Sequence, residues 1–259
     1  MKMMTIKHLH TLRNGFCLTL FALLLPMMGW AVTKQNADDA YVKGGYQQAI
    51  ADYKELLRKG ASASLFYNLG NAYYRSDSLT QAILCYERAA RLAPADDDIR
   101  FNLQFARSKT IDKVTPVSEM FFVTWYHSLV NLWGVDTWAT LSVVGLLLSL
   151  LLLLAYLFAS SVGFRKIGFF GSIAFVVVFL LSNLFAYQQK QMMVNDSGAI
   201  IISPSVSVKK TPDSKGADVF VLHEGTRVDI TDCSMKQWRG VKLADGREGW
   251  LSADVLEQI

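Results

Sequence analysis

Two long runs of residues without a charged side chain constrain this sequence more than any other feature. They cover residues 137–164 and 167–189. Each is longer than the ~20 apolar residues that a helix needs to cross the hydrocarbon core of a bilayer. A hydrophobic content of 52% agrees with a membrane protein. The sequence therefore predicts two transmembrane helices, at 137–161 and 167–189, which would form a hairpin.

A short basic segment separates the two runs. Residues 162–166 end in Arg165 and Lys166, the only charged residues between the runs. Short loops rich in Lys and Arg favour the cytoplasmic side of a membrane. We therefore predict a cytoplasmic loop at 162–166. The segments before and after the hairpin would lie on the opposite side, which is the periplasm in a bacterial cell.

The N-terminus has the pattern of a secretory signal. Basic residues precede an uncharged run at 14–33, and the apolar core of that run, 16–28, has the length of a signal h-region. A small-x-small site ends at Ala31. We expect residues 1–31 to be a signal peptide of an exported protein, cleaved after Ala31; an uncleaved anchor is the alternative.

The segment before the first apolar run is rich in aromatic residues. They are Phe121, Phe122, Trp125, Tyr126, Trp133 and Trp138. Such rings favour the headgroup layer of a bilayer. We predict an interfacial aromatic linker at 111–136, containing a helix that leads into the membrane. A partner-binding helix is the alternative.

An ordered series of small and large residues predicts a helical hairpin. A helical pattern runs over 63–74, is broken, and resumes over 80–92 before Pro94. Gly70 and Ala82 would lie where the two helices cross, since a larger side chain there would push the backbones apart. Ala89 would contact the next hairpin.

This series resembles the tetratricopeptide repeat. The matching residues are Phe66, Leu69, Gly70, Tyr73, Ala82, Tyr86, Ala89 and Pro94. The glycine that the family has in the turn is replaced by Asp77. One such hairpin cannot bury its own faces, so neighbouring helices are required.

Neighbours are present on both sides of the hairpin. Upstream, Ala49 and Tyr53 repeat the second-helix pattern after a short first helix, and downstream 96–108 is typical of a single capping helix. The acidic run at its start, 95–100, suits a helix N-terminus. We predict a repeat domain at 32–110 that needs its membrane neighbours or a partner for rigidity.

The resemblance also implies a binding surface. Repeats of this class bind extended peptides or helices along the concave face, which the first helix of each pair lines. The residues placed there are Tyr67, Asn71, Tyr74, Arg75, Phe101 and Phe105. Packing against the neighbouring repeat is the alternative for Tyr67 and Tyr74. We expect no lysine on this face, so a clamp for a terminal carboxylate is not predicted.

After a linker at 190–198 the composition changes to short Val- and Ile-rich runs separated by turn residues. Strands are predicted near 199–202, 205–209, 218–223, 226–232, 238–243 and 247–251. The order at 199–259 resembles bacterial SH3-like domains, small all-β barrels, through Gly225, Trp238 and the Gly249–Trp250 pair. Such domains can bind peptidoglycan or short peptides. Trp238 would be the ligand-binding residue, or simply a half-buried barrel residue, and His223 is expected on the surface.

No feature of the sequence predicts an enzyme. The four histidines fall in unrelated segments, and no HExxH, Walker, GxSxG or paired-carboxylate motif is present. The three cysteines lie far apart without metal-site spacing. No metal or cofactor is therefore expected. The net charge of +4 has no Lys/Arg stripe behind it, so nucleic-acid binding is not predicted either.

The order of segments resembles the BatE family of the Bacteroides aerotolerance (Bat) operon: signal, tetratricopeptide repeats, two-span hairpin and SH3-like domain. The resemblance implies an inner-membrane protein encoded beside a MoxR-type ATPase and membrane proteins with von Willebrand A (VWA) domains. It also implies a role in tolerance of oxygen or other stress. We predict a non-enzymatic interaction scaffold of the bacterial envelope. A peptidoglycan-binding envelope sensor is the alternative.

Overall fold

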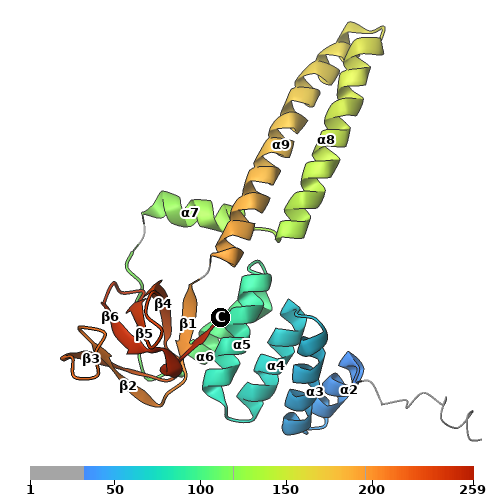
Figure 1. Cartoon of the computed structure of the whole chain (residues 1–259). Helices are drawn as coiled ribbons and strands as arrows, with labels where there is room; N and C mark the ends of the chain where they lie inside the picture. The colour runs from blue at the N-terminus through green and yellow to red at the C-terminus, as the bar shows by residue number, and fades with distance from the viewer. Residues whose placement is uncertain (1–31, 119, 196) are drawn as a thin grey trace, which may run out of the picture.

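The structure, a computed structural model, describes residues 32–118, 120–195 and 197–259. The predicted signal peptide lies outside these residues. A helical domain and a β domain pack side by side, and a long helical hairpin projects away from both of them (Figure 1). A short helix, α7 (Phe121–Val130), lies across the base of that hairpin.

The helical domain consists of consecutive antiparallel helices that follow the predicted pattern. They are α2 (Lys34–Val42), α3 (Tyr46–Lys59), α4 (Ala63–Arg75), α5 (Leu79–Leu92) and α6 (Asp97–Arg107). Helices α4 and α5 form a hairpin where the series of small and large residues predicts one. Ala49 and Tyr53 of α3 are buried, as are Ala82 and Ala89 of α5.

Local signals set the ends of these helices. The Ser62 hydroxyl accepts a hydrogen bond from the Leu65 N–H and so caps α4. The acidic run before α6 has the predicted capping role, because a carboxylate oxygen of Asp96 accepts from the Asp98 and Ile99 N–H groups. In the α4–α5 turn Asp77 has φ +59°, which explains why related repeats have glycine at this position.

Two long apolar helices form the projecting hairpin. They are α8 (Val135–Phe158) and α9 (Val162–Val194), and both are long and apolar enough to cross a membrane. Small residues bring them close together: a Cβ atom on Gly168 would lie 2.7 Å from the Leu152 carbonyl oxygen. The Asn183 side chain donates a hydrogen bond to the Ser142 hydroxyl at 2.6 Å.

The bounds predicted for the loop between these helices are wrong. The turn is 159–161, and Arg165 and Lys166 lie within the first turns of α9. Helix α9 also continues to Val194, through most of the predicted linker at 190–198. Basic and glutamine residues are good helix formers, so nothing ends the helix at the change of composition.

The β domain is a seven-stranded antiparallel sheet with the order β3-β2-β6-β5-β4-β1-β7. The strands are β1 (Gly198–Ile201), β2 (Ser205–Lys209), β3 (Asp218–His223), β4 (Arg227–Asp232), β5 (Trp238–Lys242), β6 (Glu248–Ser252) and β7 (Leu256–Gln258). Six strands lie close to their predicted positions. Strand β7 was not predicted; it follows a short 3-10 helix and pairs with β1.

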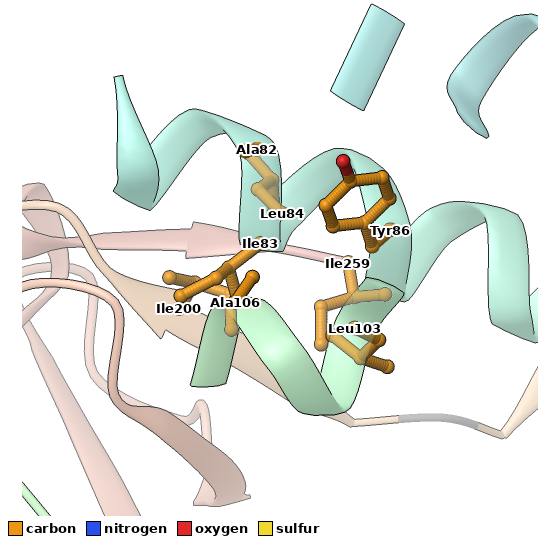
Figure 2. Packing of buried hydrophobic residues seen from close by; sticks show 8 residues of the cluster. All are labelled: Ala82, Ile83, Leu84, Tyr86, Leu103, Ala106, Ile200 and Ile259. Atoms are coloured by element: carbon orange, nitrogen blue, oxygen red, sulfur yellow. The ribbon is translucent and has the colours of Figure 1, made fainter. Parts of the chain in front are cut away.

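The two domains share one hydrophobic core, which the sequence analysis did not predict. Ile200 of β1 and Ile259, directly after β7, pack among Ile83, Leu103 and Ala106 of α5 and α6 (Figure 2). The β domain therefore covers the apolar face at the end of the helical stack. It supplies the neighbour that the stack was expected to need.

A buried carboxylate lies at the centre of the polar contacts between the domains. Glu87 of α5 accepts hydrogen bonds from Arg107 of α6 and from Arg227 of β4, the latter at 3.0 Å. Its side chain is 2% exposed. Nearby, Arg88 pairs with Glu257 of β7 at 3.1 Å. The interface thus combines an apolar centre with charge-assisted hydrogen bonds.

The turn between β3 and β4 fits closely against α5, which gives a first prediction. Gly225 has φ +81°, and a Cβ atom there would lie 3.0 Å from Thr110 Cγ2 and 3.2 Å from Ile83 Cδ1. Gly225→Ala should therefore combine backbone strain with overpacking of the interface, at a cost of about 2 kcal/mol of unfolding free energy. Thermal unfolding of the full chain in detergent measures the loss.

Gly246→Ala is the matched control for this prediction. Gly246 has φ +92° but an added Cβ would meet only Val117 Cγ2, at 3.9 Å. Gly246→Ala would have the same backbone strain but no steric clash, so it should lower the free energy of unfolding by about 1 kcal/mol less than Gly225→Ala does. Equal losses for the two variants would show that the Gly225 turn is not closely packed against the helices.

Residues 111–117 bind the β domain, so the prediction that 111–136 forms one interfacial linker is wrong. The Asp112 carboxylate accepts hydrogen bonds from the His223 N–H at 2.6 Å and the Thr226 hydroxyl at 2.7 Å. His223 Nδ1 lies 3.0 Å from the other carboxylate oxygen, so His223 has a partner that the sequence analysis did not identify. Val114 packs against the β-domain core.

This contact predicts a loss of stability in acid. Burial by itself would raise the pKa of Asp112, but hydrogen bonds from His223 and Thr226 hold it below the ordinary value of 3.8. A carboxyl with a lowered folded-state pKa stabilises the fold above its unfolded-state pKa, and the contribution is lost as pH falls through the folded-state value. Asp112→Asn should lower the melting temperature at pH 7, and the gap to wild type should close below about pH 4. A gap that persists in acid would contradict this role.

Candidate protein-interaction surface

The predicted binding residues lie on α4 and α6, and Tyr41 of α2 extends the same surface. We call this surface the inner-helix face and define it by Tyr41, Tyr67, Asn71, Tyr74, Arg75, Phe101 and Phe105. The structure separates these residues into two groups. One group makes contacts within the helical domain, and the other is open to solvent.

Tyr67 and Asn71 hold α6 against the hairpin. The Tyr67 hydroxyl accepts a hydrogen bond from the Asn102 amide at 3.0 Å. The Asn71 amide oxygen accepts from the Tyr86 hydroxyl at 2.7 Å and from Asn102 at 3.1 Å. Both residues are half-buried. Packing against the neighbouring helix, the alternative left open for Tyr67, is the contact that the structure shows.

Phe101 and Phe105 form the most exposed part of the face. They are 69% and 44% exposed, lie on consecutive turns of α6 and have parallel rings 6.5 Å apart. The half-buried Tyr74 extends this surface, with its ring 5.8 Å from that of Phe105. Large exposed rings of this kind are enriched where proteins bind other proteins.

Two cations lie over aromatic rings at or beside this face. Arg75 donates a hydrogen bond to the Tyr46 hydroxyl at 3.1 Å, and its guanidinium lies 5.6 Å from the Tyr46 ring. The Lys109 ammonium lies 5.1 Å from the Phe105 ring centre. Lys109 follows the last turn of α6 and is not among the residues that define the face, so the expectation of no lysine there stays a prediction. The arrangement suits a partner segment that carries apolar side chains and acidic groups.

Two tyrosines beside Arg75 were not predicted from the sequence. Tyr41 of α2 and Tyr46 of α3 have ring centres 5.6 Å apart beside Arg75. Burial raises the pKa of Tyr41, so its hydroxyl stays protonated at neutral pH. The spacing could have revealed Tyr41, because it precedes Tyr74 by one repeat length. Because the first helix is short, the repeat position of Tyr41 was not recognised.

Comparison with known proteins identifies the central hairpin. Residues 63–96 match the tetratricopeptide repeat. The match covers α4, α5 and the N-cap of α6. Tetratricopeptide repeats generally mediate interactions between proteins, in agreement with the exposed rings on the inner-helix face. No curated protein matches the chain.

Trp238 lies in a second candidate site, on the β domain. It is half-buried at the start of β5 and lines an open pocket with polar neighbours. These neighbours include Asp213, Ser214, Lys236, Gln237, Ser252 and Asp254. An aromatic ring beside carboxylates, hydroxyls and an amide can bind a sugar or a short peptide. Trp250, also half-buried, does not line this pocket.

The described residues hold no group of three or more His, Cys, Asp or Glu that could bind a metal ion. Among the cysteines, Cys85 is buried and Cys233 is exposed. Burial raises the pKa of the Cys85 thiol to about 12, so it stays protonated and unreactive at neutral pH.

Proposed function

We propose that the chain is a non-enzymatic, membrane-anchored scaffold of the bacterial envelope, whose tetratricopeptide repeats bind a protein partner. The exposure of Phe101 and Phe105 beside Tyr74 is the observation that supports it best. These rings lie on a helix that is fixed between α5 and the β domain. The partner would therefore meet a preorganised surface, which lowers the entropic cost of binding.

The contact between the domains supports a hairpin with two membrane crossings. The helical domain precedes α8 and the β domain follows α9, yet they share one core. Both must therefore lie on the same side of any membrane that the hairpin enters, which requires an even number of crossings. Arg165 and Lys166 at the far end of the hairpin favour the cytoplasm there. The tetratricopeptide and SH3-like domains would then be periplasmic.

The length of α9 supports the same arrangement. Its 33 residues extend for about 50 Å, against a hydrocarbon thickness of about 30 Å. The last turns, with Gln188 and Lys190, would emerge on the periplasmic side. They connect directly to β1.

The resemblance to the BatE family suggests the partners. They would be VWA-domain membrane proteins and a MoxR-type ATPase complex, in a pathway of aerotolerance and stress resistance. VWA-domain proteins with periplasmic parts could reach the inner-helix face directly. The ATPase would then be recruited through them.

A mild-detergent pull-down of the tagged full-length chain from native membranes tests this proposal. Phe101→Ser with Phe105→Ser should abolish recovery of the VWA proteins and the ATPase, because it removes the exposed rings and keeps the Tyr67–Asn102 hydrogen bond. Val219→Ser with Val221→Ser is the control, since both valines are exposed on β3. Recovery that survives the phenylalanine changes would place the partner elsewhere.

The orientation has its own test in intact spheroplasts. A cysteine placed at Lys166 should stay unlabelled by a membrane-impermeant thiol reagent, whereas the exposed Cys233 should react. Labelling at position 166 would reverse the proposed topology.

The pocket at Trp238 favours a second function, a peptidoglycan-binding envelope sensor. Purified full-length protein would then bind muropeptides, and Trp238→Ala would abolish that binding. Trp250→Phe, which leaves the pocket intact, is the control. Equal muropeptide binding by wild type and Trp238→Ala would exclude this site.

A further inference from the structure

Helix α7 is fixed to the base of the long hairpin through one of its sides. Val130 is fully buried with Trp138 of α8 and Phe185 of α9. The Trp138 indole N–H donates a hydrogen bond to the Val130 carbonyl oxygen at 2.9 Å. The Tyr126 ring lies 6.3 Å from that of Phe185. The position of α7 relative to the hairpin is therefore set by packing and hydrogen bonding.

A second side of α7 is polar and faces the helical domain. Thr124, His127 and Ser128 lie three and four residues apart, so they share one side of the helix. They line a cavity whose other wall is the α5–α6 turn and the start of α6, including Pro94 and Arg100. The polar side of α7 is thus turned toward the tetratricopeptide domain.

The remaining side of α7 is aromatic and uncovered. Phe121 is 84% exposed and Trp125 is 68% exposed, and Phe122 lies beside them. In helical projection these rings lie on the arc between the polar side and the side that packs on the hairpin. Exposed rings of this size in one cluster mark a binding surface. Helix α7 lies at the base of the hairpin, where α8 begins and α9 ends (Figure 1), and both long helices carry exposed apolar side chains.

We propose that α7 lies in the headgroup layer of the bilayer, with Phe121, Phe122 and Trp125 in contact with lipid. The proposal rests on membrane insertion of the α8–α9 hairpin. Phenylalanine rings bury apolar area at the boundary of the acyl chains, and the tryptophan indole suits the level of the headgroups. Thr124, His127 and Ser128 stay in water, facing the soluble domains.

This placement fixes the position of the helical domain and the β domain relative to the membrane surface. The α5–α6 turn faces α7 across a water-accessible cavity with both polar and apolar lining residues. The tetratricopeptide domain would therefore stand directly above the headgroups, with its α5–α6 end nearest to them. A partner that binds Phe101 and Phe105 would approach close to the bilayer, as a membrane-anchored protein can.

Nitroxide accessibility in lipid nanodiscs tests the proposal with the full-length chain. Cys17→Ser and Cys233→Ser remove the reactive thiols, and the buried Cys85 stays unlabelled. Spin labels are then placed singly through Trp125→Cys, His127→Cys and Leu151→Cys. His127 is the matched control, because it lies on the side of α7 opposite Trp125 and lines the cavity. Leu151, exposed in the middle of α8, reports on the hairpin alone.

The label at position 125 should collide with oxygen, which concentrates in lipid, several-fold more than with an aqueous nickel chelate. The label at 127 should show the reverse preference. If 125 and 127 are equally accessible to nickel while 151 is reached by oxygen alone, the hairpin is inserted but α7 is not in the bilayer. A label at 125 shielded from both reagents would mean that protein covers α7, which also overturns the proposal. Access of nickel to position 151 would overturn membrane insertion itself.

Discussion

Gly70→Leu should destabilise the helical domain by about 3 kcal/mol or more, the upper range for overpacking a closed core. A Cβ atom at Gly70 would lie 2.6 Å from Tyr86 Cε1 and 2.7 Å from Cδ1. The Tyr86 ring cannot swing away freely, because its hydroxyl donates a hydrogen bond to Asn71. The helices α4 and α5 would have to separate. Thermal unfolding of the full chain, followed by circular dichroism in detergent, measures the effect.

Gly60→Leu is the matched control for this substitution. Gly60 ends α3 with an extended backbone, and nothing lies within 4 Å of an added Cβ. The same leucine there should leave the melting temperature nearly unchanged. If Gly70→Leu melts like Gly60→Leu, the close crossing of α4 and α5 is incorrect, and with it the tetratricopeptide packing.

Glu87→Ala should also lower the free energy of unfolding strongly, by about 3 kcal/mol, which is at the low end for breaking a buried ion pair. The carboxylate is buried between Arg107 and Arg227, which come from different domains. Its removal leaves the two guanidinium groups without the carboxylate that joins them, while Arg227 keeps its contact with Asp229 at 3.6 Å. Both arginines are partly exposed, so water offsets some of the cost. The separation of the domains should also become visible as faster proteolysis of residues 108–118.

Glu55→Ala provides the comparison for this second substitution. Glu55 pairs with Arg58 on the surface of α3, where both side chains are open to water. Such a pair contributes about 0.5 kcal/mol. Unchanged proteolysis and equal melting temperatures for Glu87→Ala and Glu55→Ala would show that the Glu87 network does not hold the domains together.

Most helices and strands of this fold could be predicted from short-range residue patterns. Gly70, Ala82 and Pro94 have one-dimensional spacings that follow from the geometry of a helical hairpin. The strands alternate with turn residues such as Asp245–Gly246, where Gly246 needs its positive φ. Each of these signals acts within a few residues. That is why they can be read without knowledge of the tertiary structure.

The contacts between distant segments could not be predicted in this way. Ile200 and Ile259 look like ordinary strand residues, yet they complete the core beneath α5. Asp112 looks like a linker residue and binds His223, more than a hundred positions later. For the candidate site, the spacing identified Phe101 and Phe105, but it could not distinguish them from Tyr67, whose hydrogen bond depends on where α6 packs.

The shared core also has a consequence for biosynthesis. Its helical half is made before the hairpin, and its other half, from Ile200 to Ile259, is made after it. The apolar face of α5 and α6 therefore stays uncovered until both α8 and α9 have been synthesised. A chain that inserted only one of them would leave its two halves on opposite sides of the membrane, with Ile83 and Leu103 exposed. Only a chain that inserted both helices could then form the shared core, and proteases would degrade a chain whose two domains stay apart.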